Sequence, residues 1–320
     1  MSLPVLVAPD SFKGSFSAAE VAAAVATGLR DAGRDATELP VADGGEGTMG
    51  VLVSALGGEV RTVRVNDPLG RPVDASFAML PDGRTAIVEM AQASGLGRVT
   101  QEERDAFAAS TYGTGELIAA AVDAGAERVL VTVGGSATTD GGAGAVEALE
   151  GIDVRLEVVC DVRTPWEQAS RVYGPQKGAD PGTVKRLERR LDELAERAPR
   201  DPRGVPMSGA AGGLSGGLWA YRGAELCAGA SYVLDAVGFD ERMRESAFVV
   251  TGEGRLDDQT AQGKIVGEVA TRCRQGGVAC HAVVGSDALE PFKARILDLS
   301  SVTEAGTLEA LRDAGLALAG

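Results

Sequence analysis

Short apolar runs alternate with segments of helical periodicity along most of this chain. Each run is bounded by glycine, proline or acidic residues, which is typical of buried strands. The runs are residues 3–8, 128–133, 156–160, 247–251 and 278–284. Helices are expected between them at about 18–32, 114–124, 181–194 and 260–273. This alternation predicts an α/β protein with a largely parallel sheet.

Helix boundaries are marked by local signals at two places. Ser17 and Glu20 have the spacing of a capping box, and Gly33 follows the helical segment as a stop signal. Asp180 followed by Pro181 is typical of the first residues of a helix. The apolar residues after this pair lie on one helical face and are Val184, Leu187, Leu191 and Leu194.

Residues 60–90 break the alternation. Three strand-like runs, at 60–65, 75–79 and 85–90, are separated by the turn sequences NDPLGRP and PDG. This spacing predicts an antiparallel meander, which we interpret as the start of a second domain inserted into the first. For 320 residues, two domains are the expected number. The predicted division is residues 1–60 plus 245–320 for one domain and 61–244 for the other.

Composition narrows the class of protein. Apolar residues make up 44% of the chain and aromatic residues 4%, so the core must consist mainly of Ala, Val and Leu. The net charge of −15, with no basic stripe, argues against a nucleic-acid partner. No apolar run is long enough for a membrane span. Four cysteines without a CxxC pair, and a start without a basic leader region, predict a cytoplasmic protein.

Five loops contain an acidic residue, glycine or both, most of them where an apolar strand ends. They are APDSFKGS at 8–15, ADGGEGT at 42–48, GGSATTDGG at 134–142, CDV at 160–162 and TGEGRLDDQT at 251–260. Ligands of open α/β sheets bind outside the carboxyl ends of the strands. Glycine lets backbone N–H groups approach phosphate oxygens, and carboxylates suit Mg²⁺. One such loop is also typical of an ordinary turn, but five with nearby lysines indicate phosphoryl transfer.

Several other kinds of active site are poorly supported. The GxxxxGK[ST] motif is missing: near Lys264, Asp258 replaces the first glycine and Ile265 replaces Ser or Thr. After Gly113 and Gly115, Ile118 stands where GxGxxG needs its last glycine, and in GGSAT at 134–138, Thr138 stands where GxSxG needs its second glycine. The single histidine, His281, lies in an apolar run and is interpreted as a sheet residue. The proton acceptor must therefore be a carboxylate, which is sufficient when the hydroxyl proton leaves late in phosphoryl transfer.

The order of these loops resembles that of class I glycerate kinases. The matching blocks, in chain order, are APDSFKGS (8–15), PVADGGEGT (40–48), NDPLGRPV (66–73), IVEMAQASGL (87–96), TYGTGELI (111–118), GGSATTDGGAG (134–144), YGPQKGA (173–179), GAAGGLSGGL (209–218) and TGEGRLDDQTAQGK (251–264). The resemblance covers about residues 3–286. The chain departs from the family pattern in a compressed stretch at 144–156, in TPWEQAS at 164–170 and in the tail after Ser286.

The resemblance implies a fold and an activity that the residues alone do not show. It implies two α/β domains, one flavodoxin-like with a largely parallel sheet and one restriction-endonuclease-like, with the active site in the cleft between them. It also implies ATP and Mg²⁺ as cofactors and phosphorylation of D-glycerate at the 2-hydroxyl to give 2-phosphoglycerate. A homodimer is left open. The alternatives are a kinase for a different small hydroxy acid and a catalytically silent ligand-binding relative.

Site roles are assigned to residues in these loops. The catalytic candidates are Asp10, Lys13, Asp140 and Asp161, and the last two are also the candidate metal ligands. Substrate binding is assigned to Ser11, Asp43, Glu46, Thr48, Glu253, Arg255, Asp257 and Lys264. Nucleotide binding is assigned to Gly134, Gly135, Ser136, Thr138 and Lys177. The sequence does not decide which carboxylate orients the hydroxyl and which holds the metal.

Overall fold

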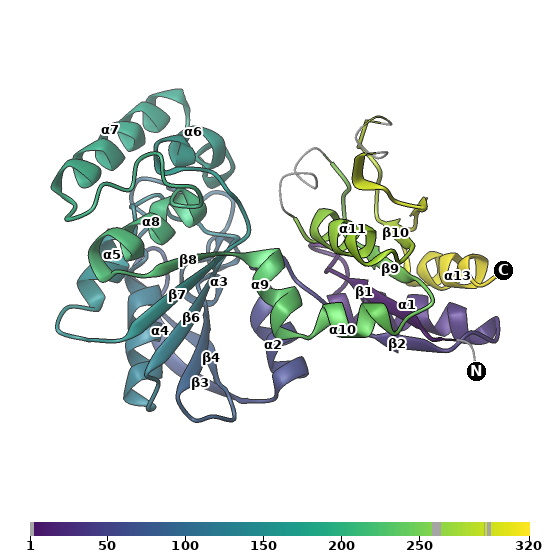
Figure 1. Cartoon of the computed structure of the whole chain (residues 1–320). Helices are drawn as coiled ribbons and strands as arrows, with labels where there is room; N and C mark the ends of the chain where they lie inside the picture. The colour runs from purple at the N-terminus through teal and green to yellow at the C-terminus, as the bar shows by residue number, and fades with distance from the viewer. Residues whose placement is uncertain (1–2, 258–263, 291, 293–295) are drawn as a thin grey trace. The chain divides into compact units, whose positions relative to one another are not determined.

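Two β-sheets divide the chain into two units (Figure 1). The structure is a computed structural model, and it describes residues 3–257, 264–290, 292 and 296–320. The first unit contains residues 1–43 and 230–320, and the second contains residues 44–229. The chain therefore has an α/β architecture in which the second unit is inserted into the first.

The sheet of the first unit is parallel throughout. Its strands are β1 (Val5–Pro9), β2 (Ala36–Glu38), β9 (Val249–Gly252), β10 (Cys280–Val284) and β11 (Ser301–Glu304), in the spatial order β2-β1-β9-β10-β11. Numbered within the unit, this is the order 2-1-3-4-5 that flavodoxin-like sheets have. The direction of strand addition reverses between β1 and β9, and doubly wound sheets bind ligands at such a point.

Helices cover both faces of this sheet. They are α1 (Ala18–Asp31), α9 (Gly229–Ala236), α10 (Phe239–Arg244), α11 (Ile265–Gly276) and α13 (Leu308–Leu318). Val5 and Val7 share a buried cluster with residues of α1 and α13. Leu6, between them, is also buried and points to the opposite face because side chains alternate along a strand. A strand buried on both faces explains the continuous apolar run in the sequence.

The sheet of the second unit is mixed. Its strands are β3 (Glu59–Asn66), β4 (Pro72–Met79), β5 (Thr85–Glu89), β6 (Arg128–Val133), β7 (Arg155–Cys160) and β8 (Glu225–Ala228), side by side in that order. The pairs β3–β4 and β4–β5 are antiparallel, and the pairs from β5 to β8 are parallel. The predicted meander is therefore confirmed, and it forms one edge of this sheet.

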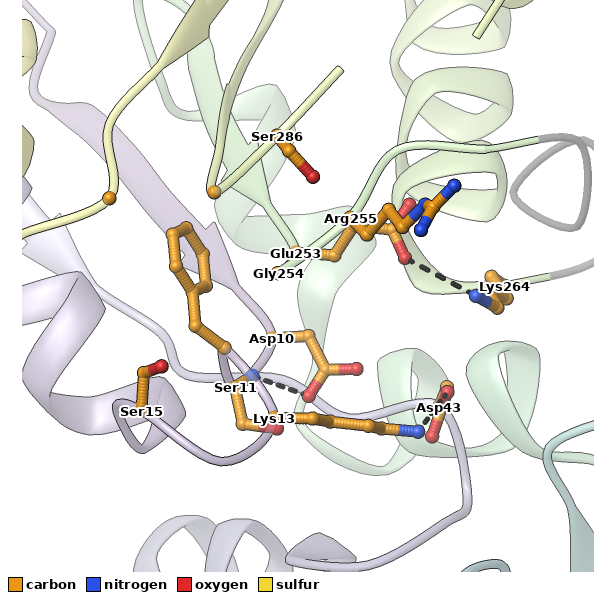
Figure 2. Close-up of a pocket in the computed structure, with 13 residues that line it drawn as sticks. Asp10, Ser11, Lys13, Ser15, Asp43, Glu253, Gly254, Arg255, Lys264 and Ser286 are labelled. Atoms are coloured by element: carbon orange, nitrogen blue, oxygen red, sulfur yellow. Dashed lines mark hydrogen bonds and ion pairs between the residues drawn. The ribbon is translucent and has the colours of Figure 1, made fainter. Parts of the chain in front are cut away.

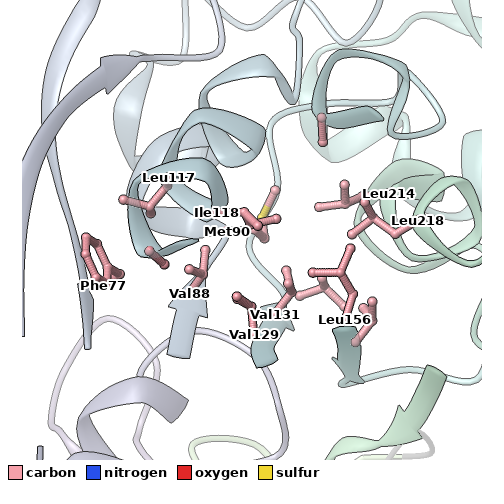
Figure 3. Close-up of a cluster of buried hydrophobic side chains, with 14 of the residues drawn as sticks. Phe77, Val88, Met90, Leu117, Ile118, Val129, Val131, Leu156, Leu214 and Leu218 are labelled. Carbon is pink, nitrogen blue, oxygen red and sulfur yellow. The ribbon is translucent and has the colours of Figure 1, made fainter. Parts of the chain in front are cut away.

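Aliphatic side chains fill the core of the second unit (Figure 3). The helices of this unit are α2 (Thr48–Leu56), α3 (Ala91–Ser94), α4 (Tyr112–Asp123), α5 (Ala143–Ala148), α6 (Ala169–Tyr173), α7 (Pro181–Arg197) and α8 (Ala210–Arg222), with short 3₁₀ turns at Leu96–Arg98, Trp166–Gln168 and Pro175–Lys177. Leu117 and Ile118 of α4 and Leu214 of α8 pack on the sheet. Among the described members of this core cluster, Phe77 is the single aromatic side chain, as the composition predicted.

The local helix signals are confirmed. Ser17 and Glu20 form the reciprocal hydrogen bonds of a capping box at the start of α1. Asp180 accepts a hydrogen bond from the amide of Thr183 at the start of α7. The predicted apolar face of α7 packs in two small clusters, one around Trp166 and one around Ala106. The expected start of the helix at 260 lies outside the described residues.

The boundaries of the units differ from those expected from the sequence. The breaks fall after Asp43 and Gly229, rather than after residues 60 and 244. Helix α2 packs on β4 and β5, which places it in the second unit. Arg272 of α11 hydrogen-bonds Asp235 at 2.6 Å and Ser231 Oγ at 2.8 Å, which ties α9 to the first unit. These long-range contacts are not visible in the sequence.

Two further expectations concern the role of His281 and the presence of membrane-spanning helices. His281 lies in β10, where Nδ1 is 2.8 Å from Ser301 Oγ and the ring packs edge-on against Phe248, so its interpretation as a sheet residue is confirmed. Among the described helices, none is both long and apolar enough to cross a membrane. The cytoplasmic location stays a prediction.

Replacing Gly28 by alanine is expected to destabilise the first unit. Alanine is the better helix former by about 1 kcal/mol, but a Cβ at position 28 would clash with the carbonyl oxygen of Arg312 on α13. Overpacking of this kind costs about 1–3 kcal/mol. Thr27→Ala, on the exposed side of the same helix, is the control and should melt near the wild-type temperature. Gly28→Ala could instead unfold at or above the midpoint temperature of the control. That result would show that α1 and α13 are not tightly packed at Gly28.

Candidate functional site

A cavity of about 400 Å³ lies at the carboxyl ends of the strands of the first unit (Figure 2). The loop after β1 contributes Asp10, Ser11, Phe12, Lys13 and Ser15, and the segment after β2 contributes Asp43. The loops after β9, β10 and β11 contribute the rest of the lining: Glu253, Gly254, Arg255, Lys264, Gly285, Ser286 and Gly306. Because parallel strands end at the same sheet edge, segments far apart in the sequence meet in one cavity.

Asp10 is a buried carboxyl group of this cavity. Its residue is 5% exposed, and its Oδ1 accepts a hydrogen bond of 2.6 Å from the amide of Ser11. Burial raises the pKa of Asp10 well above its ordinary value, and the nearby Asp43 and Glu253 raise it further. The Ser11 hydrogen bond and Lys13 lower the pKa; these effects are smaller than those of burial and Asp43, and Glu253 contributes least. A carboxyl group with a raised pKa in a cavity is a candidate proton acceptor near neutral pH.

Three cationic side chains surround the carboxyl groups of this cavity. Lys13 Nζ is 3.7 Å from Asp43 Oδ2, and Lys264 Nζ is 3.9 Å from Glu253 Oε2 (Figure 2). Arg255 Nε is 3.9 Å from Asp257 Oδ2, and Asp257 also pairs with Lys264. These pairs are longer than charge-assisted hydrogen bonds, and both lysines line the cavity, where their positive charge can attract an anion. The cavity can therefore hold a small molecule that carries both a carboxylate and hydroxyl groups.

A second group of predicted residues lies at the carboxyl end of β6, within the second unit. A Cβ at Gly134 would lie 2.7 Å from Gly45 Cα and 2.9 Å from Asp161 Oδ2, so only glycine fits there. Gly135 has a φ of 64° and lies against the side chain of Glu46. Glycine therefore lets the loops after β6 and β7 and the segment before α2 approach one another closely.

Lys177 anchors the loop that follows Gly135. Its side chain is buried, and Nζ donates hydrogen bonds to Ser136 Oγ at 2.7 Å and to the carbonyl oxygen of Thr138 at 2.6 Å. Burial lowers the pKa of Lys177 to about 7, although Asp140 and Asp161 act in the opposite direction. Both hydrogen-bond acceptors named here for Lys177 are neutral. A phosphate placed beside Ser136 would therefore stabilise the charged form of this lysine.

Asp140 organises the same loop. Its Oδ2 accepts hydrogen bonds from the amide and hydroxyl of Thr111, both at 2.8 Å, and from the amide of Gly144 at 3.2 Å. Its Oδ1 accepts from the amide of Gly142 at 3.1 Å. With its residue 1% exposed, this carboxylate is occupied by backbone and hydroxyl donors. The geometry suits a loop-stabilising group better than a base or metal ligand.

Magnesium binding was assigned to Asp140 and Asp161. Within the described part of the chain, no three His, Cys, Asp or Glu side chains cluster closely enough to hold a metal ion. Mg²⁺ in phosphoryl-transfer enzymes needs only one or two carboxylates, because phosphate oxygens and water complete its shell. Asp161 is a half-buried carboxylate beside Gly134, in the loop region assigned to the phosphates, and it meets this requirement by its chemistry and position. Both oxygens of Asp140 accept hydrogen bonds from the backbone and hydroxyl donors named above.

The structure gathers most of the predicted site residues into two groups. Asp10, Ser11, Lys13, Asp43, Glu253, Arg255 and Lys264 line the cavity of the first unit, with Asp257 paired to two of them. Glu46, Gly134, Gly135, Ser136, Thr138, Asp140, Asp161 and Lys177 lie together in the second. Thr48 lies outside both groups, because its side chain is fully buried at the start of α2, and its assignment to substrate binding stays a prediction.

Two residues beside the second group were missed by the sequence analysis. Thr111 holds Asp140 through its amide and hydroxyl, and nothing in its sequence position indicates this contact. Glu89 ends β5 and is 4% exposed. The signal that identified the other loops, an acidic residue where an apolar strand ends, was also present at Glu89 and could have identified it.

Asp10→Asn is expected to stabilise the protein increasingly as the pH rises above about 4. The folded-state pKa of Asp10 is raised above its unfolded value of about 3.9, so the native state loses stability as the carboxyl ionises. The loss is about 1.4 kcal/mol for each unit by which the pKa is raised. Asparagine keeps the acceptor for Ser11 but carries no charge.

Denaturant unfolding of wild type and Asp10→Asn at pH 4 and pH 8 measures this effect. The difference in unfolding free energy should be small at pH 4 and favour the variant at pH 8. A difference that does not change with pH would mean that Asp10 ionises normally in the folded protein.

Comparison with known proteins shows which family contains chains similar to this one. A family model described as the glycerate kinase family matches residues 5–152 and 150–309. The match thus continues beyond residue 286, where the sequence resemblance was expected to end. The glycerate kinase of Bacillus subtilis is 42% identical over an alignment 328 residues long, gaps included. The aligned parts cover 89% of this chain and 85% of that protein. The glycerate 2-kinase of Escherichia coli is 39% identical over 325 residues, with the same coverage of 89% and 85%.

A solved structure agrees with the sequence comparisons. A crystal structure from Salmonella typhimurium LT2, provisionally described as glycerate kinase 2, superimposes with a TM-score of 0.82 at 34% sequence identity. The superposition covers 100% of this chain and 98% of that one. Family match, sequence identity and fold lead to one conclusion: this chain belongs to the glycerate kinase family, and it is an enzyme of that family.

Proposed function

We propose that this enzyme transfers a phosphoryl group from ATP to the 2-hydroxyl of D-glycerate, giving 2-phosphoglycerate. The observation that carries the proposal is the cavity of the first unit, where a buried carboxyl group lies between lysine side chains in a chain of the glycerate kinase family. The E. coli relative, named a glycerate 2-kinase, supports the 2-position.

The acceptor side of the reaction is assigned to the first unit. Lys13, Lys264 and Arg255 bind the glycerate carboxylate, because they are the cationic groups of the cavity. Asp43 and Glu253 accept hydrogen bonds from glycerate hydroxyls. Ser11 and Asp257 complete this binding set. The raised pKa of Asp10 suits it to take the proton of the reacting hydroxyl as the oxygen–phosphorus bond forms.

The donor side is assigned to the loop after β6 in the second unit. Gly134 and Gly135 offer backbone N–H groups, and Ser136 and Thr138 offer hydroxyls. Lys177 donates to Ser136, so its charge is placed where a nucleotide phosphate would contact that hydroxyl. Asp140 keeps the loop in shape through Thr111, Gly142 and Gly144. We therefore assign Asp140 the role of stabilising this loop, and Asp10 the role of accepting the proton of the reacting hydroxyl.

Mg²⁺ fits beside Asp161, with the exposed Glu46 as the neighbouring acidic side chain. When bound, the ion would neutralise charge on the phosphate oxygens of the nucleotide. The phosphoryl group leaves the β-phosphate, which departs as part of ADP, and joins the glycerate oxygen while the hydroxyl proton passes to Asp10.

Phosphorus NMR of a reaction with D-glycerate, ATP and Mg²⁺ tests the proposal directly. The product resonance should be that of 2-phosphoglycerate, formed together with ADP. Lys13→Ala is expected to lower kcat/KM for glycerate about 100-fold, because it removes a charge that binds the acceptor. Lys185→Ala, at an exposed position on α7, is the matched control and should retain full activity.

Other outcomes of this experiment identify the alternatives. A phosphorylated product only from another acid in a panel of hydroxy acids would indicate a different acceptor. Nucleotide and glycerate binding by calorimetry without ADP release would indicate a silent relative. The 3-phosphoglycerate resonance would overturn the assigned position.

Gly134→Ala is expected to reduce turnover at least tenfold while leaving the fold intact. The added Cβ would press on Gly45 and Asp161, and it would shift the loop that we assign to the phosphates. Gly97→Ala is the control, because a Cβ at that exposed position meets nothing within 4 Å. Steady-state kinetics and far-UV circular dichroism on both variants provide the measurement. Equal turnover in the two variants would show that the approach of Gly134 to Gly45 is unimportant for the reaction.

A further inference from the structure

Glu89 is a buried carboxyl group that neither binding set uses. It ends β5, where it pairs in register with Thr132 of β6, two residues before Gly134. Its residue is 4% exposed. Its Oε2 accepts two hydrogen bonds, from the amide of Gly47 at 3.0 Å and from the amide of Met49 at 3.2 Å. Burial, and to a lesser degree the charge of Glu46, raise the pKa of Glu89, and the two amide bonds partly offset this.

The two amides belong to the start of α2. Gly47 is the N-cap residue of this helix, has a φ of 92°, and provides no side chain to cap it. A helix start is ordinarily capped by a Ser, Thr, Asp or Asn at the N-cap position itself. Here the acceptor instead comes from the end of a neighbouring strand, 42 residues later in the chain. The bond therefore fixes the position of the segment before α2 relative to β5, which a local cap would not do.

The segment that Glu89 fixes lies against the loop after β6. Gly45 Cα would be 2.7 Å from a Cβ at Gly134, and Glu46 Oε2 would be 3.0 Å from one at Gly135. Both contacts are close enough that a displacement of Gly45 and Glu46 must change the space available to the loop. Glu89 is therefore linked by a hydrogen bond to Gly47, which continues along the chain to Gly45 and Glu46, and these lie close to Gly134 and Gly135.

We propose that Glu89 is a positioning residue for the reaction, which holds the segment Gly45–Gly47 against Gly134 and Gly135 and so fixes the loop that receives the nucleotide phosphates. The role of that loop rests on the proposed function. Glu89 itself contacts neither substrate. A shift of about 1 Å in a positioned group can cost about 100-fold in rate.

Three variants separate this role from a general contribution to stability. In Glu89→Gln, one amide oxygen can still accept both N–H groups, because both bonds end on the same oxygen in the wild type. In Glu89→Ala, both bonds are lost. Glu116→Ala is the matched control: Glu116 Oε2 also accepts a backbone N–H, from Asn66 at 2.7 Å, on a part of α4 with no contact to this loop among the described hydrogen bonds.

Steady-state kinetics should show a 10- to 100-fold lower kcat for Glu89→Ala, with the KM for glycerate within about threefold of the wild type. Glu89→Gln should keep kcat within about threefold. Glu116→Ala should lower the melting temperature as much as Glu89→Ala while retaining turnover. Equal loss of activity in Glu89→Ala and Glu116→Ala, or no rescue by glutamine, would overturn the proposal.

Amide hydrogen exchange gives a readout that does not depend on the identity of the substrates. Exchange at Gly47 and Met49 should accelerate in Glu89→Ala, stay slow in Glu89→Gln and be unchanged in Glu116→Ala. Exchange could follow this pattern while neither the wild type nor any variant phosphorylates glycerate. In that case the proposed function is wrong, but the hydrogen bonds from Gly47 and Met49 to Glu89 are confirmed. If exchange at these amides is unchanged in Glu89→Ala, the positioning role fails whatever the activity.

Discussion

The parallel pairing of strands is the constraint on which both candidate sites depend. In the first unit all five strands run in the same direction, so the segments after β1, β2, β9, β10 and β11 must meet at one edge. In the second unit only β5 to β8 are parallel, and the acidic residue and glycines of that site follow β6 and β7. The carboxyl end of β4 lies at the opposite edge, because β4 is antiparallel to β5, and neither β3 nor β4 contributes a residue to either group.

Three buried carboxyl groups near these edges are stabilised in three different ways. Asp140 is surrounded by donors, which satisfy both oxygens and make it part of the loop's framework. Glu89 has two amide donors on one oxygen and links two segments of chain. Asp10 has one short amide bond and two acidic neighbours, so burial is poorly compensated and its pKa is raised. An uncompensated carboxyl group in a cavity is the candidate for proton transfer among the three.

Much of this architecture could be predicted from the sequence, because apolar runs, caps and turn residues act locally. The capping box at Ser17, the meander at 60–90 and the strand-end position of Asp10 follow from such signals. Contacts between distant segments could not be predicted. Thr111 and Asp140 are 29 residues apart, and only the fold brings them together. For the same reason, the sequence did not separate Asp140, which supports a loop, from Asp10, which lines a cavity.

The order of the strands along the chain has a consequence for how this protein is made. β1 pairs with β9, and α1 packs on α13, so the first unit cannot close until the last helix has left the ribosome. Translation proceeds at about 5–20 residues per second, so β1 waits on the order of ten seconds or more for its neighbour. The second unit is encoded entirely between these partners and can fold during that interval. Until then the nascent N-terminal segment exposes an apolar strand and an amphipathic helix, the kinds of surface that make incompletely folded chains prone to aggregation.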